Sequence, residues 1–253
     1  MTATRAVRPS VVFLDVGDTL LRAHPSWAAV YRRVLAEHGV EVEEAPLHAA
    51  LTAVFGSPDP ALEGPFEASP ATSFARSVGF DRAVLERLGH PPQPEAFFRR
   101  LEAAFAERTA WHVFDDVLPS LAAMRAAGIR LCVISNWTWS LPELLHLLEL
   151  AGRFDGLVTS ARVGYEKPHR RIFEHALELM GVGPGDAVHV GDSVHADIGG
   201  ARRVGIEPVL IARGAHPHAG IAGAQLDGTP VIADLYGLLD RSEEHTSELQ
   251  SRG

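Results

Sequence analysis

The sequence contains only one cysteine and only one lysine, although 23 of its 253 residues are basic. A single cysteine excludes a disulfide bond within the chain, and Cys132, in an apolar run, is expected to be a small buried residue. Lys167 is unusual because every other basic residue is an arginine. Lysine carries a compact ammonium charge that the planar group of arginine does not reproduce. Lys167 is therefore either a residue retained for its chemistry or a chance remnant of a compositional bias toward arginine. The residues around it in the sequence distinguish these two interpretations.

Other absences narrow the range of partners. The net charge is −9 and no block of lysine and arginine occurs, so nucleic acid is not an expected partner. The longest apolar runs are as short as β-strands, far below the roughly 20 residues of a membrane span. The first residues lack the apolar stretch of a secretory signal. These features predict a cytoplasmic protein without a membrane partner.

The end of the chain is expected to be foreign to the fold. Residues 241–253 include a segment that matches the translation of a common sequencing-library adapter. The segment is polar and has no apolar period with which it could dock as a core helix. We therefore expect the native C-terminus near Asp240 and exclude the tail from the fold.

The order of apolar patterns predicts an α/β fold. Short β-type runs occur at 11–14, 129–134, 156–159, 187–190 and 208–211. From residue 115 onward these runs alternate with helical stretches, which is typical of a parallel sheet. Helical patterns alone are found at 27–35, 45–55, 71–88 and 94–108. The sequence thus predicts a Rossmann-like core of residues 1–21 and 111–240, with helices on the sheet, interrupted by a helical insert at 22–110.

Two helices of the predicted core have clear end signals. Ser140 and Glu143 form a capping-box pattern before a leucine-rich helix that Gly152 is expected to end. Pro168 is expected at the first position of a second helix, which Gly181 ends.

Three of the predicted strands are followed by polar residues that are not the usual residues of a turn. They are Asp15, Ser135, Asn136, Asp192 and Asp197. Ligands of open α/β sheets bind outside the carboxyl ends of the strands, so these side chains are expected to converge there with Lys167. One carboxylate can act as a nucleophile, two can hold Mg²⁺, and a hydroxyl with an ammonium can bind phosphoryl oxygens. Each residue read alone also has a structural interpretation, as a turn residue or a helix cap.

Taken together, these residues resemble the four motifs of the haloacid dehalogenase-like (HAD) hydrolase superfamily, over residues 11 to about 240. The first motif is residues 15–20, the second is Ser135, the third is Lys167, and the fourth is residues 191–193 with Asp197. The insert at 22–110 resembles the helical C1-type cap of that superfamily. Residues 111–115, 134–136 and 189–192 look closest to the subgroup of HAD-like hydrolase domain-containing, Dreg-2-like proteins.

The resemblance implies a magnesium-dependent phosphatase that acts on a small phosphorylated metabolite through an aspartyl-phosphate. It implies that Asp15 is the nucleophile and that Lys167 neutralises the charge of Asp15 and the phosphate. Ser135 and the backbone N–H of Asn136 are expected to bind a phosphoryl oxygen. The implied magnesium ligands are Asp15, the backbone carbonyl of Gly17, and Asp192, with Asp197 in or near that shell.

One position departs from the superfamily pattern. A second aspartate, which acts as general acid and base, usually follows the first by two residues, but Gly17 occupies that position and Asp18 comes next. General acid–base catalysis contributes about 10²–10⁴-fold to a rate. Three interpretations remain open: Asp18 supplies the acid, the substrates have good leaving groups, or catalysis is weak.

Two further functions compete with a phosphatase. A 2-haloacid dehalogenase also lacks the second acid because halide leaves unprotonated, although it uses no metal and the Asp192 motif is a metal-binding arrangement. A catalytically weak pseudo-phosphatase would keep the fold for binding. Residues 22–110 show no signature that selects a substrate.

Overall fold

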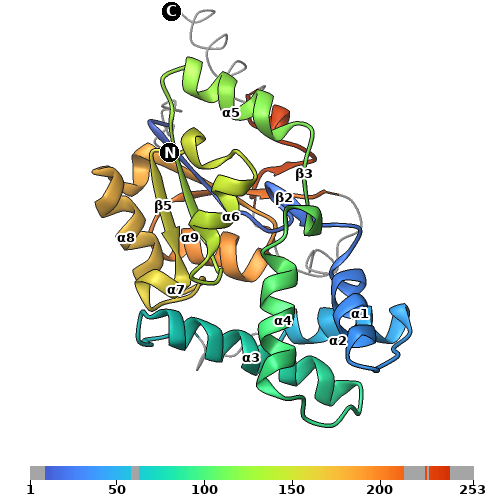
Figure 1. The fold of residues 1–253 in the computed structure, drawn as a ribbon. Helices are drawn as coiled ribbons and strands as arrows, with labels where there is room; N and C mark the ends of the chain where they lie inside the picture. Colours follow the sequence, from blue (N-terminus) through green and yellow to red (C-terminus); the bar gives the residue numbers. More distant parts are fainter. Residues whose placement is uncertain (1–8, 58–62, 214–225, 227, 240–253) are drawn as a thin grey trace, which may run out of the picture.

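A computed structural model describes residues 9–57, 63–213, 226 and 228–239 of the chain, and its centre is a six-stranded sheet (Figure 1). The strand order is β5-β4-β1-β6-β7-β8, and every neighbouring pair is parallel. The strands are β1 (Val11–Leu14), β4 (Arg130–Ser135), β5 (Gly156–Thr159), β6 (Ala187–Gly191), β7 (Glu207–Ile211) and β8 (Val231–Ile232). The predicted parallel α/β fold is confirmed, with β8 as a strand that the sequence pattern did not reveal.

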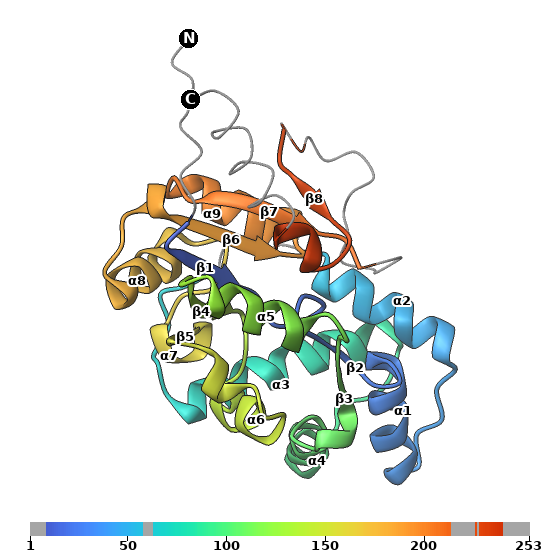
Figure 2. The same ribbon diagram turned by 90° about the horizontal axis from the view of Figure 1, so that it is seen from above.

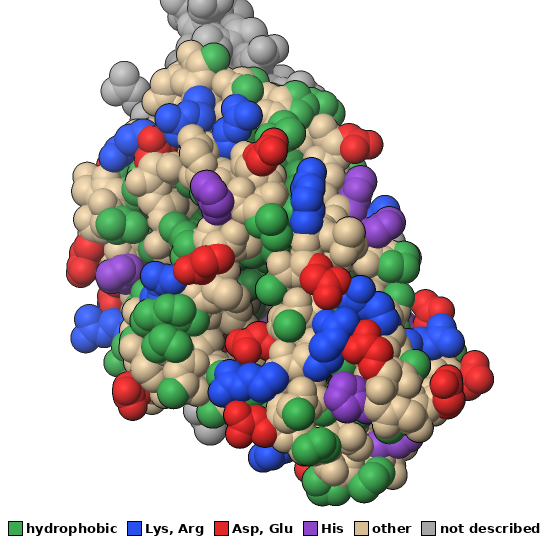
Figure 3. Space-filling view, in the orientation of Figure 1, with side chains coloured by type: hydrophobic (Ala, Val, Ile, Leu, Met, Phe, Trp, Pro, Cys, Tyr) green, Lys and Arg blue, Asp and Glu red, His purple; other side chains and the backbone are tan. Residues whose placement is uncertain are grey.

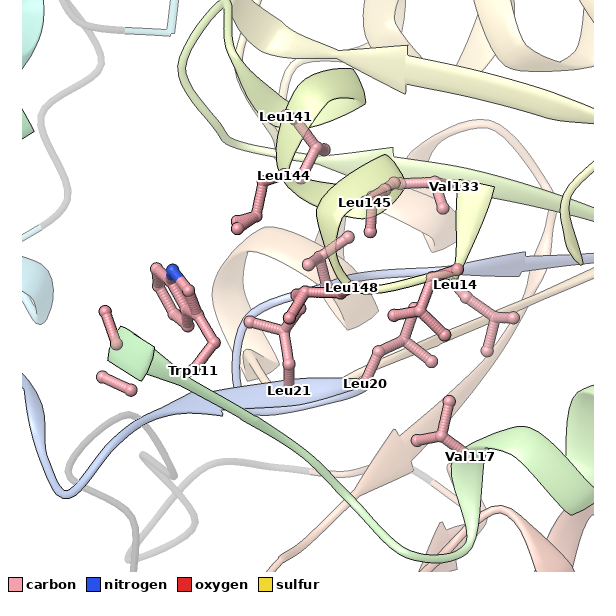
Figure 4. Close-up of a cluster of buried hydrophobic side chains, with 14 of the residues drawn as sticks. Leu14, Leu20, Leu21, Trp111, Val117, Val133, Leu141, Leu144, Leu145 and Leu148 are labelled. Carbon is pink, nitrogen blue, oxygen red and sulfur yellow. The ribbon is translucent and has the colours of Figure 1, made fainter. Parts of the chain in front are cut away.

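Helices cover both faces of this sheet because successive side chains of each strand point to opposite sides. On one face, Val11 and Phe13 of β1 pack in a cluster with α8 (Arg170–Met180). On the other face, Val12 and Leu14 join a larger cluster that includes α5 (Val117–Ala126) and α6 (Leu141–Leu147). Figure 4 shows leucines of β1, β2 and α6 meeting in that second cluster. The short helices α7 (Ser160–Val163) and α9 (Gly200–Arg203) complete the core.

Four helices follow β1 before the chain enters the rest of the sheet, and we call them the helical layer. They are α1 (Trp27–Glu37), α2 (Glu44–Phe55), α3 (Pro70–Arg87) and α4 (Glu95–Phe105). Figures 1 and 2 show them gathered beside the sheet. No strand occurs in the described part of 27–105, and no described helix is long and apolar enough to span a bilayer.

A two-stranded antiparallel ribbon marks where the chain leaves and re-enters the core. It pairs β2 (Leu21–Ala23) with β3 (Trp111–Val113). The ribbon was not predicted, because three residues are too few to show a period of two. It holds the two ends of the helical layer side by side.

The observed ends of α8 and α6 agree only in part with the ends that the sequence predicted for these helices. Gly181 ends α8 in a left-handed conformation, as predicted, but the helix begins at Arg170 with His169 as its N-cap, so Pro168 lies before it. Ser140 does precede α6, but its side chain makes no capping hydrogen bond. The prediction for Gly152 was wrong, because α6 ends at Leu147. The tail at 241–253 lies outside the described residues.

The helical layer is tied to the core beside Lys167. The backbone N–H of Phe66 donates to the carbonyl of Gly164 (3.0 Å), and that of Glu166 donates to the carbonyl of Glu63 (2.7 Å). The guanidinium of Arg76 on α3 forms an ion pair with Glu166 (2.6 Å). Gly164 has a φ of +81°, and a Cβ there would lie 2.5 Å from the carbonyl oxygen of Phe66. The close approach of the two segments therefore requires glycine.

Replacing Gly164 with alanine should loosen this junction. A left-handed alanine costs about 1–2 kcal/mol, and the contact with Phe66 should add about 1–3 kcal/mol. Gly128→Ala is the matched control, because Gly128 has a φ of +79° and nothing within 4 Å of its Cβ position. Denaturant unfolding should show the larger loss for Gly164→Ala, and equal losses would contradict the contact.

Candidate active site

Three neighbouring strands bring the predicted residues together. Asp15 follows β1, Ser135 ends β4 and Asp192 follows β6, and these strands are adjacent in the order β4-β1-β6. The chain passes from β1 to β4 and β5 and then returns to the other side of β1 with β6. This reversal creates a crevice at the carboxyl ends of the strands, which is where open α/β sheets bind ligands. The predicted convergence is thus present in the structure.

Lys167 lies at the centre of this group. Its Nζ donates to Oδ1 of Asp15 and to Oδ1 of Asp197, both at 2.6 Å, and to the carbonyl of Ile134 at 3.0 Å. The residue is 5% exposed. The hydroxyl of Ser135 donates to the same Oδ1 of Asp15 (2.9 Å). One oxygen of Asp15 is therefore held in place from two sides.

The electrostatics keep Lys167 charged. Burial would lower its pKa, but the charges of Asp15 and Asp197 outweigh burial and raise the pKa above its ordinary value. Burial would raise the pKa of Asp197, but Lys167 and His189 hold it below its ordinary value. The ammonium and the Asp197 carboxylate form a buried ion pair, and removing either partner of such a pair typically costs about 3–5 kcal/mol.

Asp197 is held by more than Lys167. His189, which is fully buried on β6, contacts Oδ1 of Asp197 through Nε2 (2.8 Å), and the backbone N–H of Ser193 donates to Oδ2 (3.0 Å). A Cβ at Gly191 would lie 2.1 Å from the carboxyl carbon of Asp197, so only glycine leaves room for this side chain. The contact of His189 with Asp197 was not predicted from the sequence. The signal that could have revealed it is a single polar residue within an otherwise apolar, buried strand.

The side chain of Asn136 contacts the backbone of Lys167. Its Nδ2 donates to the carbonyl of Lys167 (2.9 Å), and its Oδ1 accepts from the N–H of Lys167 (2.7 Å). This two-way hydrogen bonding fixes the backbone from which the ammonium projects. The predicted role of Asn136 involved only its backbone N–H, so positioning Lys167 is a role that the structure adds.

An acidic group faces the crevice. Oxygens of Asp15, Asp192 and Asp197 all lie within 4.8 Å of one another. Burial raises the pKa of Asp192 well above its ordinary value, and the negative charges of Asp15, Asp197 and Asp18 raise it further. Burial likewise raises the pKa of Asp15. One ammonium does not balance this group, and carboxylate oxygens suit Mg²⁺, so the residues present fit a magnesium ion.

Gly17 and Asp18 form a tight turn beside the acidic group. Asp18 has a φ of +53°, which is unusual for a residue other than glycine, and its N–H donates to the carbonyl of Leu21 (2.7 Å). Asp18 is buried and its charge acts on Asp192. A Cβ at Gly17 would lie 3.4 Å from the ring of Trp137, in van der Waals contact, so the turn itself does not exclude a Cβ at this position.

Arg213 holds the same turn from behind, and sequence reasoning missed it. Its Nε donates to the carbonyl of Thr19 (2.8 Å), while its two terminal nitrogens each donate to an oxygen of Asp116 at 2.8 Å. This two-pronged geometry is the one for which arginine is suited. A single arginine among many carries no sequence signal, so only the fold reveals the contact.

A large cavity opens over the site. It has a volume of about 1910 Å³ and is lined both by residues of the acidic group and by residues of the helical layer. Figure 3 shows the surface hollowed between α6 and α4, with hydrophobic side chains inside. Its aromatic lining includes Trp27, Tyr31, Phe105, Trp111 and Trp137. A ligand at Asp15 would therefore extend between the sheet edge and an aromatic surface.

The parallel sheet carries a buried lysine–carboxylate group at its edge, and comparison with known proteins identifies the family as one of hydrolases. The haloacid dehalogenase-like hydrolase family matches residues 9–205. Haloacid dehalogenase-like hydrolase domain-containing protein 3 of Bos taurus is 30% identical over 200 residues, 78% of this chain and 80% of that protein. A phosphoserine phosphatase of Thermus thermophilus is 30% identical over 226 residues, 82% of this chain and 90% of that protein. The chain belongs to the haloacid dehalogenase-like hydrolase family.

Solved structures agree on the fold. The putative HAD-hydrolase YfnB of Bacillus subtilis, bound to magnesium, superposes with a TM-score of 0.72 at 16% identity and covers 92% of this chain and 97% of its own. The L-2-haloacid dehalogenase RSc1362 superposes with a TM-score of 0.71 at 19% identity and covers 94% and 100%. Similarity at this level of sequence identity concerns the fold alone and does not distinguish a phosphatase from a dehalogenase.

Magnesium should stabilise the protein more strongly as the pH rises. The pKa of Asp192 in the folded protein is raised above 3.8, so the stability it contributes is present below that value and is lost as the pH rises through the folded pKa. An ion that binds the ionised carboxylates offsets this loss, by about 2.7 kcal/mol at a hundred times its Kd.

Thermal unfolding with and without Mg²⁺, at several pH values between about 5 and 8, measures the effect. Asp192→Asn should abolish the magnesium-dependent increment. Asp186→Asn, which removes an exposed carboxylate in the turn just before β6, is the control and should keep the increment. An increment independent of pH would contradict a carboxylate-bound ion.

Proposed function

We propose that this hydrolase is a magnesium-dependent phosphatase that acts on a small phosphorylated molecule through an aspartyl-phosphate. The observation that carries the proposal is the geometry of Asp15. Its Oδ1 is held by Ser135 and by a charged Lys167, beside an acidic group that needs a cation. None of the described residues donates a hydrogen bond to its Oδ2, and Asp15 lines the cavity. Oδ2 is therefore the atom proposed to attack.

The reaction follows from this arrangement. Oδ2 of Asp15 attacks the phosphorus, a new oxygen–phosphorus bond forms, and the bond to the leaving oxygen breaks with its electron pair on that oxygen. Water then attacks the phosphorus of the aspartyl-phosphate and restores Asp15 with release of inorganic phosphate. Lys167 neutralises the nucleophile as the phosphate approaches. The Ser135 hydroxyl, which has one proton to donate, turns from Asp15 to a phosphoryl oxygen, beside the backbone N–H of Asn136.

The proposed magnesium ligands are the carboxylates of Asp15 and Asp192 and the backbone carbonyl of Gly17, with Asp197 in or near that shell. Both oxygens of Asp197 already accept hydrogen bonds, from Lys167, His189 and Ser193. When bound, the ion would supply positive charge to the phosphate and to the acidic group.

The helical layer is proposed to act as a cap over the phosphate site, with residues 22–110 as the cap and residues 1–21 and 111–240 as the core. Both parts line the cavity, and the ion pair of Arg76 with Glu166 joins them next to Lys167. A cap that contributes lining residues controls which leaving group fits.

Gly17 favours substrates whose leaving oxygen needs no proton, such as aryl or acyl phosphates. With Mg²⁺, kcat/KM should be at least about 10²-fold higher for an aryl phosphate than for an alkyl phosphate of similar size, because general acid catalysis contributes about 10²–10⁴-fold. A phosphate-release assay measures both rates. Asp15→Asn is the control and should abolish both. Equal rates on the two substrates would refute the leaving-group interpretation.

Gly17→Asp should restore the missing acid. A Cβ fits at residue 17 in contact with the ring of Trp137, so the variant should raise alkyl phosphate hydrolysis by about 10-fold or more while changing aryl phosphate hydrolysis little. Asp18→Asn keeps a residue that tolerates the left-handed turn and removes the adjacent charge. An unchanged alkyl rate in Gly17→Asp, together with a large loss in Asp18→Asn, would assign the acid role to Asp18 instead.

A dehalogenase would share with this protein the absence of an acid at the position of Gly17, and this is the observation in its favour. The acidic group at metal-binding distance favours the phosphatase, because a halide needs no metal to leave. Halide release from a 2-haloacid without Mg²⁺ would reverse the assignment. Tight binding of phosphorylated metabolites by calorimetry, with no turnover, would instead indicate a binding protein.

A further inference from the structure

A buried carboxyl–phenol pair lies in the helical-layer wall of the cavity, away from the acidic group. The hydroxyl of Tyr31 on α1 donates a short hydrogen bond to Oδ1 of Asp81 on α3. Asp81 is 8% exposed and Tyr31 is 2% exposed, and both line the cavity. Neither residue belongs to the four superfamily motifs. A buried carboxyl group that faces a cavity is a candidate for contact with a ligand.

Asp81 lacks the partner that a buried carboxylate normally has. Among the described residues, no lysine, arginine or histidine forms an ion pair with it. Burial raises the pKa of Asp81 to about 7 against the opposing effect of the Tyr31 hydrogen bond, and the negative charge of Glu102 on α4 raises it further. A cation from outside the protein would relieve this cost, since buried charges are usually paired.

A continuous row of aromatic rings connects this pair with the phosphate site. Trp137 packs beside Gly17, and its ring centroid lies 5.1 Å from that of Trp111. Trp111 lies 5.8 Å from Phe105, which lies 5.7 Å from Tyr31. The apolar body of a substrate can pack along these rings, and aromatic faces also attract cations.

We propose that Asp81 and Tyr31 are specificity-determining residues that bind a cationic amine at the far end of the substrate. The substrate class is then a phosphate ester with an apolar or aromatic body and a terminal ammonium group. The assignment of the phosphate end rests on the proposed phosphatase function. The Asp81 carboxylate accepts hydrogen bonds from the ammonium, Tyr31 fixes the carboxylate, and the row of rings holds the body between them.

Matched aryl phosphates test the preference. Tyramine phosphate and para-propylphenyl phosphate have the same shape but differ in a terminal ammonium or methyl group. A longer pair, para-aminobutylphenyl and para-pentylphenyl phosphate, allows for a longer distance between the phosphate site and Asp81. At one length at least, kcat/KM with Mg²⁺ should be about 10-fold or more higher for the ammonium compound, because hydrogen bonds to charged groups are among the stronger ones. No preference at either length would overturn the proposal.

Two variants separate recognition from structure. Asp81→Asn should bring the ammonium-to-methyl ratio of kcat/KM close to one, whereas Glu86→Gln, at an exposed acid of the same helix, should leave the ratio as in the wild type. Equal losses on both substrates in Asp81→Asn would mean a structural role only. The wild-type ratio should also be larger at about pH 8 than at about pH 6, because the ammonium needs the ionised carboxylate.

Tyr31→Phe provides a second variant that retains the carboxyl group. The Tyr31 hydrogen bond lowers the pKa of Asp81, so its loss should move the rise of the ammonium-to-methyl ratio to higher pH. Apart from burial, the pKa of Asp81 is shifted by the hydrogen bond of the Tyr31 phenol and by the negative charge of Glu102 on α4, and the variant leaves Glu102 in place. An unchanged pH profile would show that Tyr31 does not act on the recognition step.

A binding measurement keeps the two proposals distinguishable. Calorimetry with tyramine and with para-propylphenol requires no turnover and no phosphate. The wild-type protein should bind tyramine about 10-fold more tightly, and Asp81→Asn should lose this difference. If no phosphate ester is hydrolysed but tyramine is still preferred, the phosphatase function fails and the amine site stands. If aryl phosphates are hydrolysed and tyramine is not preferred, the amine site fails alone.

Discussion

The ammonium of Lys167, shared between Asp15 and Asp197 inside the protein, is the interaction on which the rest of the site depends. Its nitrogen donates hydrogen bonds to Asp15, which follows β1, and to Asp197, which lies beyond β6. The carbonyl of Ile134 on β4 accepts a hydrogen bond from the same nitrogen. Three neighbouring strands are thereby joined at their carboxyl ends. Lysine suits this position because three acceptors surround a single small nitrogen, an arrangement that the planar fork of arginine does not match. The presence of one lysine in a chain otherwise rich in arginine has a physical explanation here.

One ammonium does not neutralise the three carboxylates of Asp15, Asp192 and Asp197, and the contacts around these carboxylates reflect the excess of negative charge. Asp197 receives the additional contacts of His189 and Ser193, whereas Asp192 remains beside other carboxylates. In the proposed function a divalent ion shares the acidic group, and its charge would allow the site to receive a phosphate, which brings further negative charge. The family membership, and the presence of a phosphatase among the relatives, agree with this electrostatic arrangement.

The two unusual features of the site point in the same direction. Gly17 removes a proton donor from the leaving group, and the ring of Trp137 packs beside the position where that donor would stand. An aromatic leaving group needs the donor least and packs best against such a ring. The aromatic surface of the helical layer and the absence of an acid at residue 17 therefore both favour the proposed substrates, which carry a good aromatic leaving group.

The sequence by itself determined the parallel α/β core, the helical character of 27–105 and the grouping of Asp15, Ser135, Lys167 and Asp192, because periodicity and strand ends are local signals. It misplaced the end of α6 and missed the ribbon of β2 and β3, where the local signal is weak or misleading. Only the tertiary structure decided that His189 contacts Asp197, that Arg213 holds the turn after Asp15, and that Tyr31 and Asp81 meet across two helices. The contacts of Arg213 and of Tyr31 join residues far apart in the chain, and even His189 and Asp197, eight residues apart, meet only because the chain turns after β6. Burial and electrostatic interactions of this kind exist only once the elements have packed.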